Sequence, residues 1–284
     1  MTFTNANAHI FIPNLGNEGE NVATALAKTT DLCIGAHQDD IEVMAYGPIA
    51  ACFGQETRYF TGVTVTDGGG SPRTGVYADY TDEDMKKIRV IEQNNAAQIG
   101  RYAAQVNLVW PSSGVKDPSN RALIEELKAI ILAASPDVIY THNIADKHDT
   151  HVGVTMHVIR ALRELPAENR PRLIGMEVWR SLDWLCDEYK VVFDNGAYPN
   201  LSMALMGVYD SQISGGKRYD LAAQGRRVSN ATFYASHAVD VLESAAFGLD
   251  MSAMIKDNTD PEAFITEYIQ KFAMDVTQRV RKLK

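Results

Sequence analysis

A histidine and two adjacent aspartates follow an apolar run near the N-terminus, and side chains of these types can bind a metal ion. His37, Asp39 and Asp40 belong to the stretch LCIGAHQDDIE at residues 32–42. Imidazole nitrogens and carboxylate oxygens are suitable ligands for a divalent metal such as zinc. If one aspartate binds the metal, its neighbour on the same turn can act as a base. The alternative interpretation is a solvated turn whose carboxylates cap the following helix.

A second cluster of histidines follows a later apolar run. His142, His148 and His151 are three of the seven histidines in the chain. His148 and His151 are three residues apart at the predicted start of a helix, so both can face one cavity. Together with His37 and Asp40, His151 would complete a set of three protein ligands and leave a position open for water. This arrangement is typical of catalytic rather than structural zinc sites.

Alternating strand and helix patterns place both clusters at one edge of a predicted sheet. Apolar and β-branched runs predict strands at about 31–36, 59–66, 106–110, 136–140 and 173–182. Helices are predicted between them, at about 41–53, 81–102, 118–131 and 150–165. This alternation favours a Rossmann-like α/β fold, with a mostly parallel sheet flanked by helices. In such a fold, ligands bind outside the carboxyl ends of the strands.

Two of these helices carry more detailed signals. Asp117 and Pro118 are predicted to be the N-cap and first residue of the helix that ends near residue 131. The helix that starts after Thr81 has apolar residues at helical spacing, which predict its buried stripe: Met85, Ile88, Ile91, Ile99 and Tyr102.

The two ends of the chain have less regular patterns. Residues 1–20 are polar and are predicted to form an arm. We expect one domain over residues 1–284 with its core at about 30–185, and an irregular C-terminal portion, 186–284, that covers the sheet or the pocket. The last helix, from Pro261, has an apolar stripe that covers the sheet or makes a subunit contact: Phe264, Tyr268, Phe272, Val276 and Val280.

Composition and charge argue against several classes of protein. The net charge of −9 at pH 7 argues against a general nucleic-acid-binding protein. Three cysteines without paired spacing indicate free thiols and a reducing compartment. Residues 1–30 lack the regions of a signal peptide, and no apolar run approaches the roughly 20 residues of a transmembrane helix. We therefore expect a cytoplasmic protein without a nucleic-acid or membrane partner.

The two motifs together resemble those of the PIG-L/LmbE-like zinc-dependent amide deacetylases, which act mainly on N-acetylglucosaminyl compounds. The family's first motif, AHPDDxE, is AHQDDIE here, with Gln38 in place of proline. The second motif, HxDH, is HDTH here, with Thr150 in place of aspartate. The resemblance covers about residues 30–165 and includes Arg89 and Glu92 on the helix after the second predicted strand.

The resemblance implies a role for each residue of the two motifs. His37, Asp40 and His151 would be the ligands of Zn²⁺, or of another divalent metal. Asp39 would be the general base that takes a proton from a metal-activated water. His148 would be a protonated imidazole that stabilises the oxyanion or assists the leaving amine.

Several other polar and aromatic residues have two readings each. With Thr150 in the second motif, either Asp146 or Asp149 is a candidate to orient His148. Glu42 is either a partner of a ligand histidine or an exposed helix carboxylate. Three further residues are candidates for substrate binding, from the loop after the second strand and the loop after the fourth: Asp67, Arg73 and His142. Two tryptophans form either a sugar-stacking wall or core packing: Trp179 and Trp184.

These observations predict a zinc-dependent hydrolase that removes an acyl group, most simply acetyl, from the amide nitrogen of an amino-sugar-like substrate. One alternative is a metallohydrolase of a different amide. Another is a non-enzymatic sugar or metabolite-binding protein that keeps the fold and the metal. Members of the family are often oligomeric, so a homo-oligomer is also expected.

Overall fold

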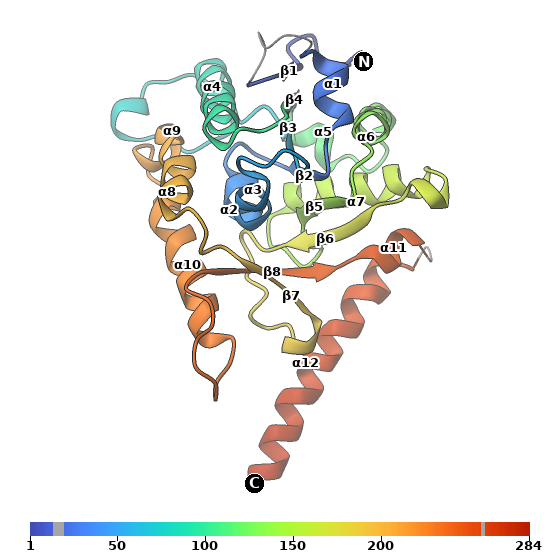
Figure 1. Ribbon diagram of the computed structural model, residues 1–284, viewed down its shortest axis with the longest axis vertical. Coiled ribbons are helices and arrows are strands. Elements are labelled where there is room, and N and C mark those ends of the chain that lie inside the picture. The colour runs from blue at the N-terminus through green and yellow to red at the C-terminus, as the bar shows by residue number, and fades with distance from the viewer. Residues whose placement is uncertain (14–19, 257–258) are drawn as a thin grey trace.

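The computed structural model describes residues 1–13, 20–256 and 259–284, and its centre is an eight-stranded sheet with helices on both faces (Figure 1). The strands are β1 (His9–Phe11), β2 (Asp31–Gly35), β3 (Phe60–Thr66), β4 (Ala104–Trp110), β5 (Val138–His142), β6 (Arg172–Met176), β7 (Lys190–Asp194) and β8 (Ala245–Asp250). Their order across the sheet is β1-β4-β3-β2-β5-β6-β8-β7. Neighbours from β4 to β6 pair in parallel, whereas β1, β7 and β8 form antiparallel pairs. The predicted α/β fold with a mostly parallel sheet is confirmed.

Helices cover both faces of the sheet. One face carries α2 (Asp40–Met44), α3 (Tyr46–Cys52), α4 (Asp82–Gly100) and α8 (Pro199–Gly207). The other face carries α1 (Val22–Ala27), α6 (Arg121–Ala134), α7 (Asp149–Arg163) and α11 (Ser252–Lys256). The remaining helices are α5 (Ser112–Lys116), α9 (Asp210–Ile213), α10 (Tyr219–Phe233) and α12 (Pro261–Leu283). Each face has its own apolar cluster of buried side chains.

The central strands explain why the two motifs meet. Every residue of β2 and β3 is buried, as expected for parallel strands between two helical layers. β2 pairs in parallel with β5, with Cys33 opposite Tyr140. Because the carboxyl ends of these neighbouring strands lie side by side, the segments that follow them, 36–40 and 142–151, share one edge of the sheet.

Three details differ from the sequence-based expectations. Helix α6 begins at Arg121 and is capped by Asn120, whose side chain accepts from the N–H of Leu123 at 3.2 Å. Asp117 instead accepts from the N–H of Ser119 at 2.8 Å, which closes a turn before the helix. The strand predicted at 173–182 leaves the sheet after Met176.

The buried face of α4 is also more polar than expected. Ile91 and Ile99 of the predicted stripe are 53% and 36% exposed. Arg89, Glu92 and Gln93 are buried in their place. This face of α4 therefore packs through hydrogen bonds rather than through apolar contacts alone.

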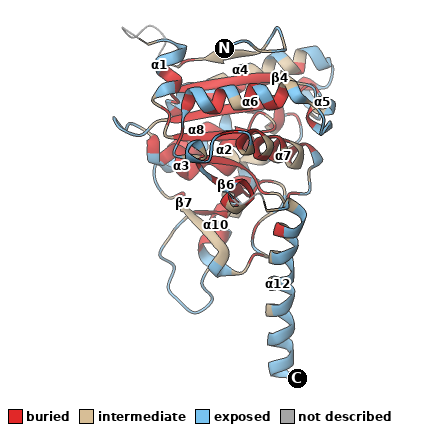
Figure 2. Cartoon of the chain, turned by 90° about the vertical axis from the view of Figure 1, so that its right-hand side faces the viewer, coloured by how far each residue is buried: buried red, intermediate tan, exposed pale blue. Residues whose placement is uncertain are grey.

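The C-terminal portion extends the sheet and surrounds one end of it. Strands β7 and β8 add to the β6 edge, and α8, α9 and α10 lie beside α2 and α4 (Figure 1). Arg227 on α10 donates to the backbone oxygens of Glu42 and Val43, at the C-terminal side of the first motif. Helix α12 projects away from the body, and most of its residues are exposed (Figure 2). Within the described part of the chain, no helix is both long enough and apolar enough to cross a membrane.

Candidate metal-binding active site

The turn between β2 and α2 carries the histidine and both aspartates of the first motif. Asp39 has φ 90° and ψ −29°, a left-handed conformation that is unusual for a residue other than glycine. Such strain costs about 1–3 kcal/mol and persists only with support from the surroundings. Arg89 provides support by donating to the backbone oxygen of Gln38 and, over 3.2 Å, to Asp39 Oδ2. The side chain of Gln93 accepts the N–H of Asp39 at 3.3 Å.

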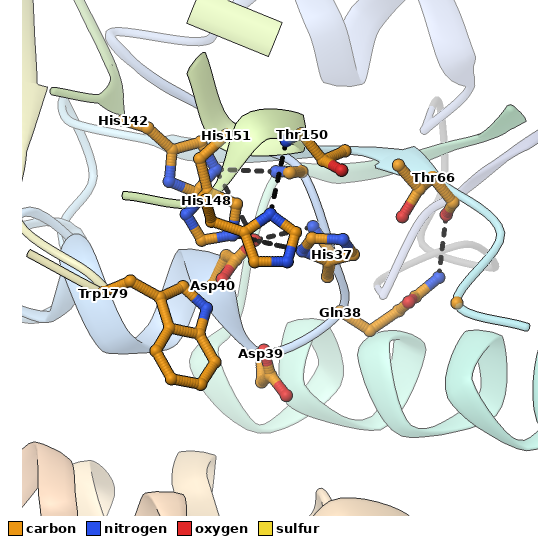
Figure 3. Close-up of polar contacts among 12 residues, drawn as sticks. His37, Gln38, Asp39, Asp40, Thr66, His142, His148, Thr150, His151 and Trp179 are labelled. Atoms are coloured by element: carbon orange, nitrogen blue, oxygen red, sulfur yellow. Dashed lines mark hydrogen bonds and ion pairs between the residues drawn. The ribbon is translucent and has the colours of Figure 1, made fainter. Parts of the chain in front are cut away.

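Side chains from this turn and from α7 converge on one carboxylate oxygen (Figure 3). His37 Nδ1 lies 3.2 Å from Asp40 Oδ2, and His151 Nε2 lies 3.3 Å from the same oxygen. The two imidazole nitrogens are 3.2 Å apart. Ligands about 2.0–2.1 Å from a tetrahedral ion lie about 3.3–3.4 Å from one another. The chemistry and the spacing of these three donors therefore fit a divalent metal ion.

Neighbouring groups fix the orientation of these donors. The backbone N–H of His37 donates to Asp40 Oδ2 at 2.7 Å. Asp146 Oδ2 lies 3.5 Å from His151 Nδ1 and accepts the N–H of Trp179 at 3.1 Å. A carboxylate behind a ligand histidine sets the ring orientation and the tautomer. Asp146 therefore supports His151, the side chain whose Nε2 belongs to the donor set.

Opposite charges stabilise this cluster against the cost of burial. Burial alone would raise the pKa of Asp40, but His151 and His142 hold it well below its usual range. Burial would lower the pKa of His151, but Asp40 and Asp146 raise it to about 9. Without a metal, the cluster is thus a buried ion pair. A divalent cation would replace the imidazole proton, because a histidine ligand must be deprotonated.

His142 lies behind the donor set and is completely buried. Its ring stacks on His151, with the centroids 3.8 Å apart. His142 Nε2 is 3.5 Å from Asp40 Oδ2, so Asp40, His142 and His151 also have ligand spacing. However, the same nitrogen accepts the N–H of Ala36 at 2.9 Å, which occupies its lone pair. His142 therefore braces the turn rather than facing a substrate.

Asp39 lies next to the donor set and lines the cavity. It is 5% exposed. Burial raises its pKa, Arg89 partly offsets this increase, and the charge of Asp40 adds to it. Asp39 Oδ2 pairs with Arg89, whereas Oδ1 has no hydrogen-bond partner among the described residues. One carboxylate oxygen is thus held in place while the other is available to a ligand.

His148 caps the N-terminus of α7 through its side chain. Its Nδ1 accepts the N–H of Thr150 at 3.3 Å (Figure 3). Burial, followed by the charges of His151 and His37, lowers its pKa to about 4. The resemblance implies a protonated imidazole here, but this geometry favours a neutral ring with its proton on Nε2. This geometry follows from Thr150, since the residue at this position offers a backbone N–H and no carboxylate to His148.

The two aspartates that could have replaced the missing carboxylate do not contact the ring of His148. Asp146 accepts only the backbone N–H of His148, at 2.9 Å, and its other contacts are with His151 and Trp179. Asp149 is exposed in the first turn of α7. His37, His148 and His151 also form a group with metal-ligand spacing.

A cavity of about 450 Å³, a volume that suits a small molecule, is lined by His37, Asp39, Asp40 and His148. The ring of Trp179 faces His148 at 6.2 Å between centroids and meets Tyr219 edge to face at 6.1 Å. Lys217 Nζ lies 5.2 Å from the Trp179 ring centroid. Other lining residues come from three elements: the loop that follows β3 (Gly68, Gly70, Ser71 and Pro72), α5 (Ser112 and Lys116) and α10 (Ala222, Ala223 and Arg226).

Three residues predicted to bind substrate do not line this cavity. His142 is buried behind His151, as described above. The guanidinium of Arg73 donates to the backbone oxygens of Gly69 and Tyr80 and pairs with Asp82. Asp67 Oδ1 accepts the N–H of Gly69 at 3.1 Å and so closes its own turn. The structure gives no support for Asp67, Arg73 or His142 as substrate contacts.

The sequence allows the two tryptophans either to form a wall of the substrate site or to pack in the core, and the structure has one in each position. Trp179 lines the cavity. Trp184 packs against the apolar cluster on the face of the sheet that carries α6 and α7, and its ring lies 6.4 Å from that of Phe272. Tyr219 and Lys217 were not predicted as site residues, because no pattern in the sequence connects α10 with a motif at residues 36–42.

Two buried glutamates, one in the first motif and one on α4, accept hydrogen bonds from residues that are distant in the sequence. Glu42 is completely buried and accepts from Tyr102 Oη at 2.7 Å and from Tyr209 Oη at 2.5 Å. Glu92 accepts from both the N–H and the hydroxyl of Ser211, at 2.7 and 2.6 Å. Glu42 is therefore not an exposed helix carboxylate, and Glu92 anchors α9 to α4.

Gln38, which replaces the proline of the family motif, has its own partner. Its side-chain Nε2 donates to the backbone oxygen of Thr66 at 3.0 Å (Figure 3). This bond ties the turn after β2 to the end of β3. A proline has no side-chain donor and could not form it.

Comparison with solved structures defines the class of the fold. The N,N′-diacetylchitobiose deacetylase from Pyrococcus horikoshii is 14% identical, with a TM-score of 0.61 over 79% of this chain and 85% of that one. GalB, a 4-carboxy-2-hydroxymuconate hydratase from Pseudomonas putida, is 16% identical, with a TM-score of 0.59 over 78% and 96%. The conserved protein TT1542 from Thermus thermophilus is 17% identical, with a TM-score of 0.58 over 78% and 94%. The mixed sheet flanked by helices is thus the fold of the PIG-L deacetylases.

One region of the sequence matches a known protein family. Residues 32–162 match the family described as PIG-L: GlcNAc-PI de-N-acetylase. Both motifs lie within this region, so the resemblance to the PIG-L/LmbE-like family is confirmed there. No curated protein gave a significant match.

Proposed function

We propose that this protein is a metal-dependent hydrolase that removes an acyl group, most simply acetyl, from the amide nitrogen of an amino-sugar-like substrate. The observation that supports this most directly is the donor set of His37, Asp40 and His151 beside the carboxylate of Asp39 in one cavity. The family description names a de-N-acetylase, and one protein of the same fold is a diacetylchitobiose deacetylase.

His37, Asp40 and His151 would hold the metal, which we propose to be Zn²⁺. Two imidazoles and one carboxylate are a ligand combination that zinc uses in hydrolases. A bound zinc ion supplies a Lewis acid that polarises a carbonyl and lowers the pKa of water. The remaining chemistry depends on residues of the chain itself.

Asp39 would act as the general base. Arg89 holds one oxygen of its carboxylate, so the other can accept the proton of a water that attacks the amide. A correctly placed base contributes about 10²–10⁴-fold to the rate. His148 would donate from Nε2 to the oxygen that gains negative charge, since Nδ1 already accepts the N–H of Thr150.

Trp179 and Tyr219 would bind the sugar-like part of the substrate. Their rings meet edge to face on one wall of the cavity. An aromatic face packs well against the apolar face of a sugar ring, and a tyrosine hydroxyl can also form hydrogen bonds. Tyr219 Oη has no hydrogen-bond partner among the described residues, so it is available to a substrate hydroxyl.

Two other readings are compatible with the fold. A hydratase, GalB, is among the proteins of similar structure, so the fold alone does not determine the reaction. A protein that only binds a sugar or metabolite could also keep the donor set. Against the second reading, a binding protein has no need for a base, yet the structure holds Asp39 in a strained turn next to the donors.

The test is acetate release from a panel of N-acetylated amino sugars, with zinc content measured on the same samples. We expect native protein to bind about one zinc per chain and to release acetate. Asp39→Asn should keep the zinc and lose activity by about 10²-fold or more. His151→Ala should lose both. Full activity of zinc-loaded Asp39→Asn would refute the role of the base, and zinc binding without turnover of any amide would favour the binding protein.

A further inference from the structure

Helix α12 leaves the body of the protein after its first turns. Phe264 is 6% exposed, and Tyr268 stacks edge to face on Tyr189 at 5.3 Å between centroids. The helix then projects from the body (Figures 1 and 2), and its large apolar side chains from Ile269 onward are at least 38% exposed, although the ring of Phe272 still lies 6.4 Å from that of Trp184. A helix that extends so far into water has little tertiary packing to stabilise it.

The exposed apolar residues form one stripe along the projecting part. Five of them follow the 3–4 spacing of a helix face, with exposed fractions from 38% to 86%: Ile269, Phe272, Val276, Val280 and Leu283. Monomeric soluble proteins rarely leave a continuous apolar stripe of this kind in water. The stripe also continues from the packed residues Phe264 and Tyr268, so it is not an isolated patch.

The spacing of this stripe is symmetric about Val276. Phe272 and Val280 lie four residues before and after it, and Ile269 and Leu283 lie seven residues before and after it. An interface between two identical chains around a two-fold axis is self-complementary: if residue i meets residue j, then j meets i. Two antiparallel copies of this helix that cross at Val276 satisfy that condition at all five positions.

We propose that α12 is a dimerisation helix, which pairs with α12 of a second copy in antiparallel orientation around Val276. In this register Ile269 of each copy faces Leu283 of the other, and Phe272 faces Val280. The paired segment, 269–283, is about 21 Å long at 1.5 Å per residue.

The charges of α12 favour the antiparallel orientation over the parallel one. The acidic residues at its start, Asp260, Glu262 and Glu267, precede the paired segment, and the first half of that segment carries Lys271 and Asp275. Basic residues dominate its end: Arg279, Arg281, Lys282 and Lys284. Antiparallel pairing places the two basic ends at opposite ends of the paired segment, and it brings Lys284 of one helix next to Glu267 of the other. Parallel pairing would place the two basic ends together, which like-charge repulsion disfavours.

Sedimentation or light scattering of the full chain tests the dimer. Native protein should have the mass of two chains. Val276→Asp should convert it to a monomer, whereas Met274→Asp should remain dimeric, because Met274 is 53% exposed on the opposite side of the helix. Unchanged deacylase activity and thermal unfolding of the body would show that Val276→Asp is folded. A monomeric native protein, or equal effects of the two substitutions, would overturn the proposal.

Cysteine cross-linking tests the register. The background is Cys186→Ser, because the other two cysteines are buried. Under oxidation Val276→Cys should form a covalent dimer, and Met274→Cys should not. Ile269→Cys and Leu283→Cys should each stay uncrosslinked alone but cross-link when mixed, after the subunits exchange. Cross-linking of either one with itself would indicate parallel pairing and overturn the antiparallel register.

Discussion

Asp39 and Asp40 are adjacent in the sequence, but the fold surrounds them with different groups. Asp40 lies beside His151 and His142, whose charges hold its pKa well below the usual range against the effect of burial. Asp39 faces the buried guanidinium of Arg89 and the cavity, and burial raises its pKa. A ligand must stay ionised and a base must be able to take up a proton, so these environments suit two separate roles.

At the residue scale, Asp146 should determine how firmly His151 holds a metal. Asp146→Asn removes the carboxylate next to His151 Nδ1, and loss of such a partner typically weakens metal affinity by about 10–100-fold. Competition with a zinc chelator measures this change. The matched control is Asp149→Asn, because Asp149 is exposed in the same segment and should leave the affinity unchanged. Equal affinities of the two variants would contradict the role of Asp146.

His148 should act as a hydrogen-bond donor rather than as a cation. His148→Gln keeps a side-chain N–H near the same place, whereas His148→Ala removes it. We expect the alanine variant to lose about 10²–10³-fold in kcat, and the glutamine variant to lose clearly less. Zinc content should be similar in both. If glutamine is as inactive as alanine, a charged or proton-transferring imidazole is needed instead.

At the element scale, the C-terminal helices hold the first motif in place. Arg227 of α10 is 3% exposed and donates to Glu42 O, Val43 O and Ser202 Oγ. Arg227→Met would leave these acceptors without a donor, and we expect a loss of about 1–3 kcal/mol in the free energy of unfolding. Arg218→Met is the control, because Arg218 forms an exposed ion pair with Asp220 and should change stability by less than about 0.5 kcal/mol. Urea unfolding measures both.

Asp31, the first residue of β2, should make the free energy of unfolding fall as the pH becomes acidic. Burial opposes the charge of Asp31, but hydrogen bonds from Arg58 and Thr30 outweigh it and lower its pKa. A carboxyl with a depressed folded pKa stabilises the protein above its unfolded value of about 3.9, and this contribution is lost as the pH falls through the lower folded pKa. Asp31→Asn should therefore be less stable than native protein at pH 7. In urea unfolding at a series of pH values, the gap should shrink below about pH 4; a constant gap would contradict this account.

The elements that the sequence predicts well are those with long, regular patterns. β2 has an apolar centre, β3 is rich in threonine and valine, β5 begins with an apolar run, and α7 has a clear 3.6-residue period, so the edge that carries both motifs is predictable. β7 and β8 are not, because their pairing is non-local and their segment has no regular alternation. The buried face of α4 is missed for a related reason: Arg89 and Gln93 are buried only because the turn at Asp39 needs their hydrogen bonds.

At the scale of the whole molecule, the site is built from both halves of the chain. The residues that the sequence proposes as ligands, His37, Asp40 and His151, come from the region that matches the PIG-L family. One wall of the cavity, with Trp179 and Tyr219, comes from the portion beyond residue 162. That wall could not be predicted, because the contact of α10 with the first motif depends on side chains such as Arg227 that are far away in the sequence.

The central claim is that His37, Asp40 and His151 share one metal ion. Crystals grown with zinc, measured at wavelengths above and below the zinc absorption edge, test this directly. We expect one anomalous peak within about 2.0–2.3 Å of His37 Nδ1, Asp40 Oδ2 and His151 Nε2. A zinc-supplied crystal without a peak there, or with the ion held by other side chains, would contradict it.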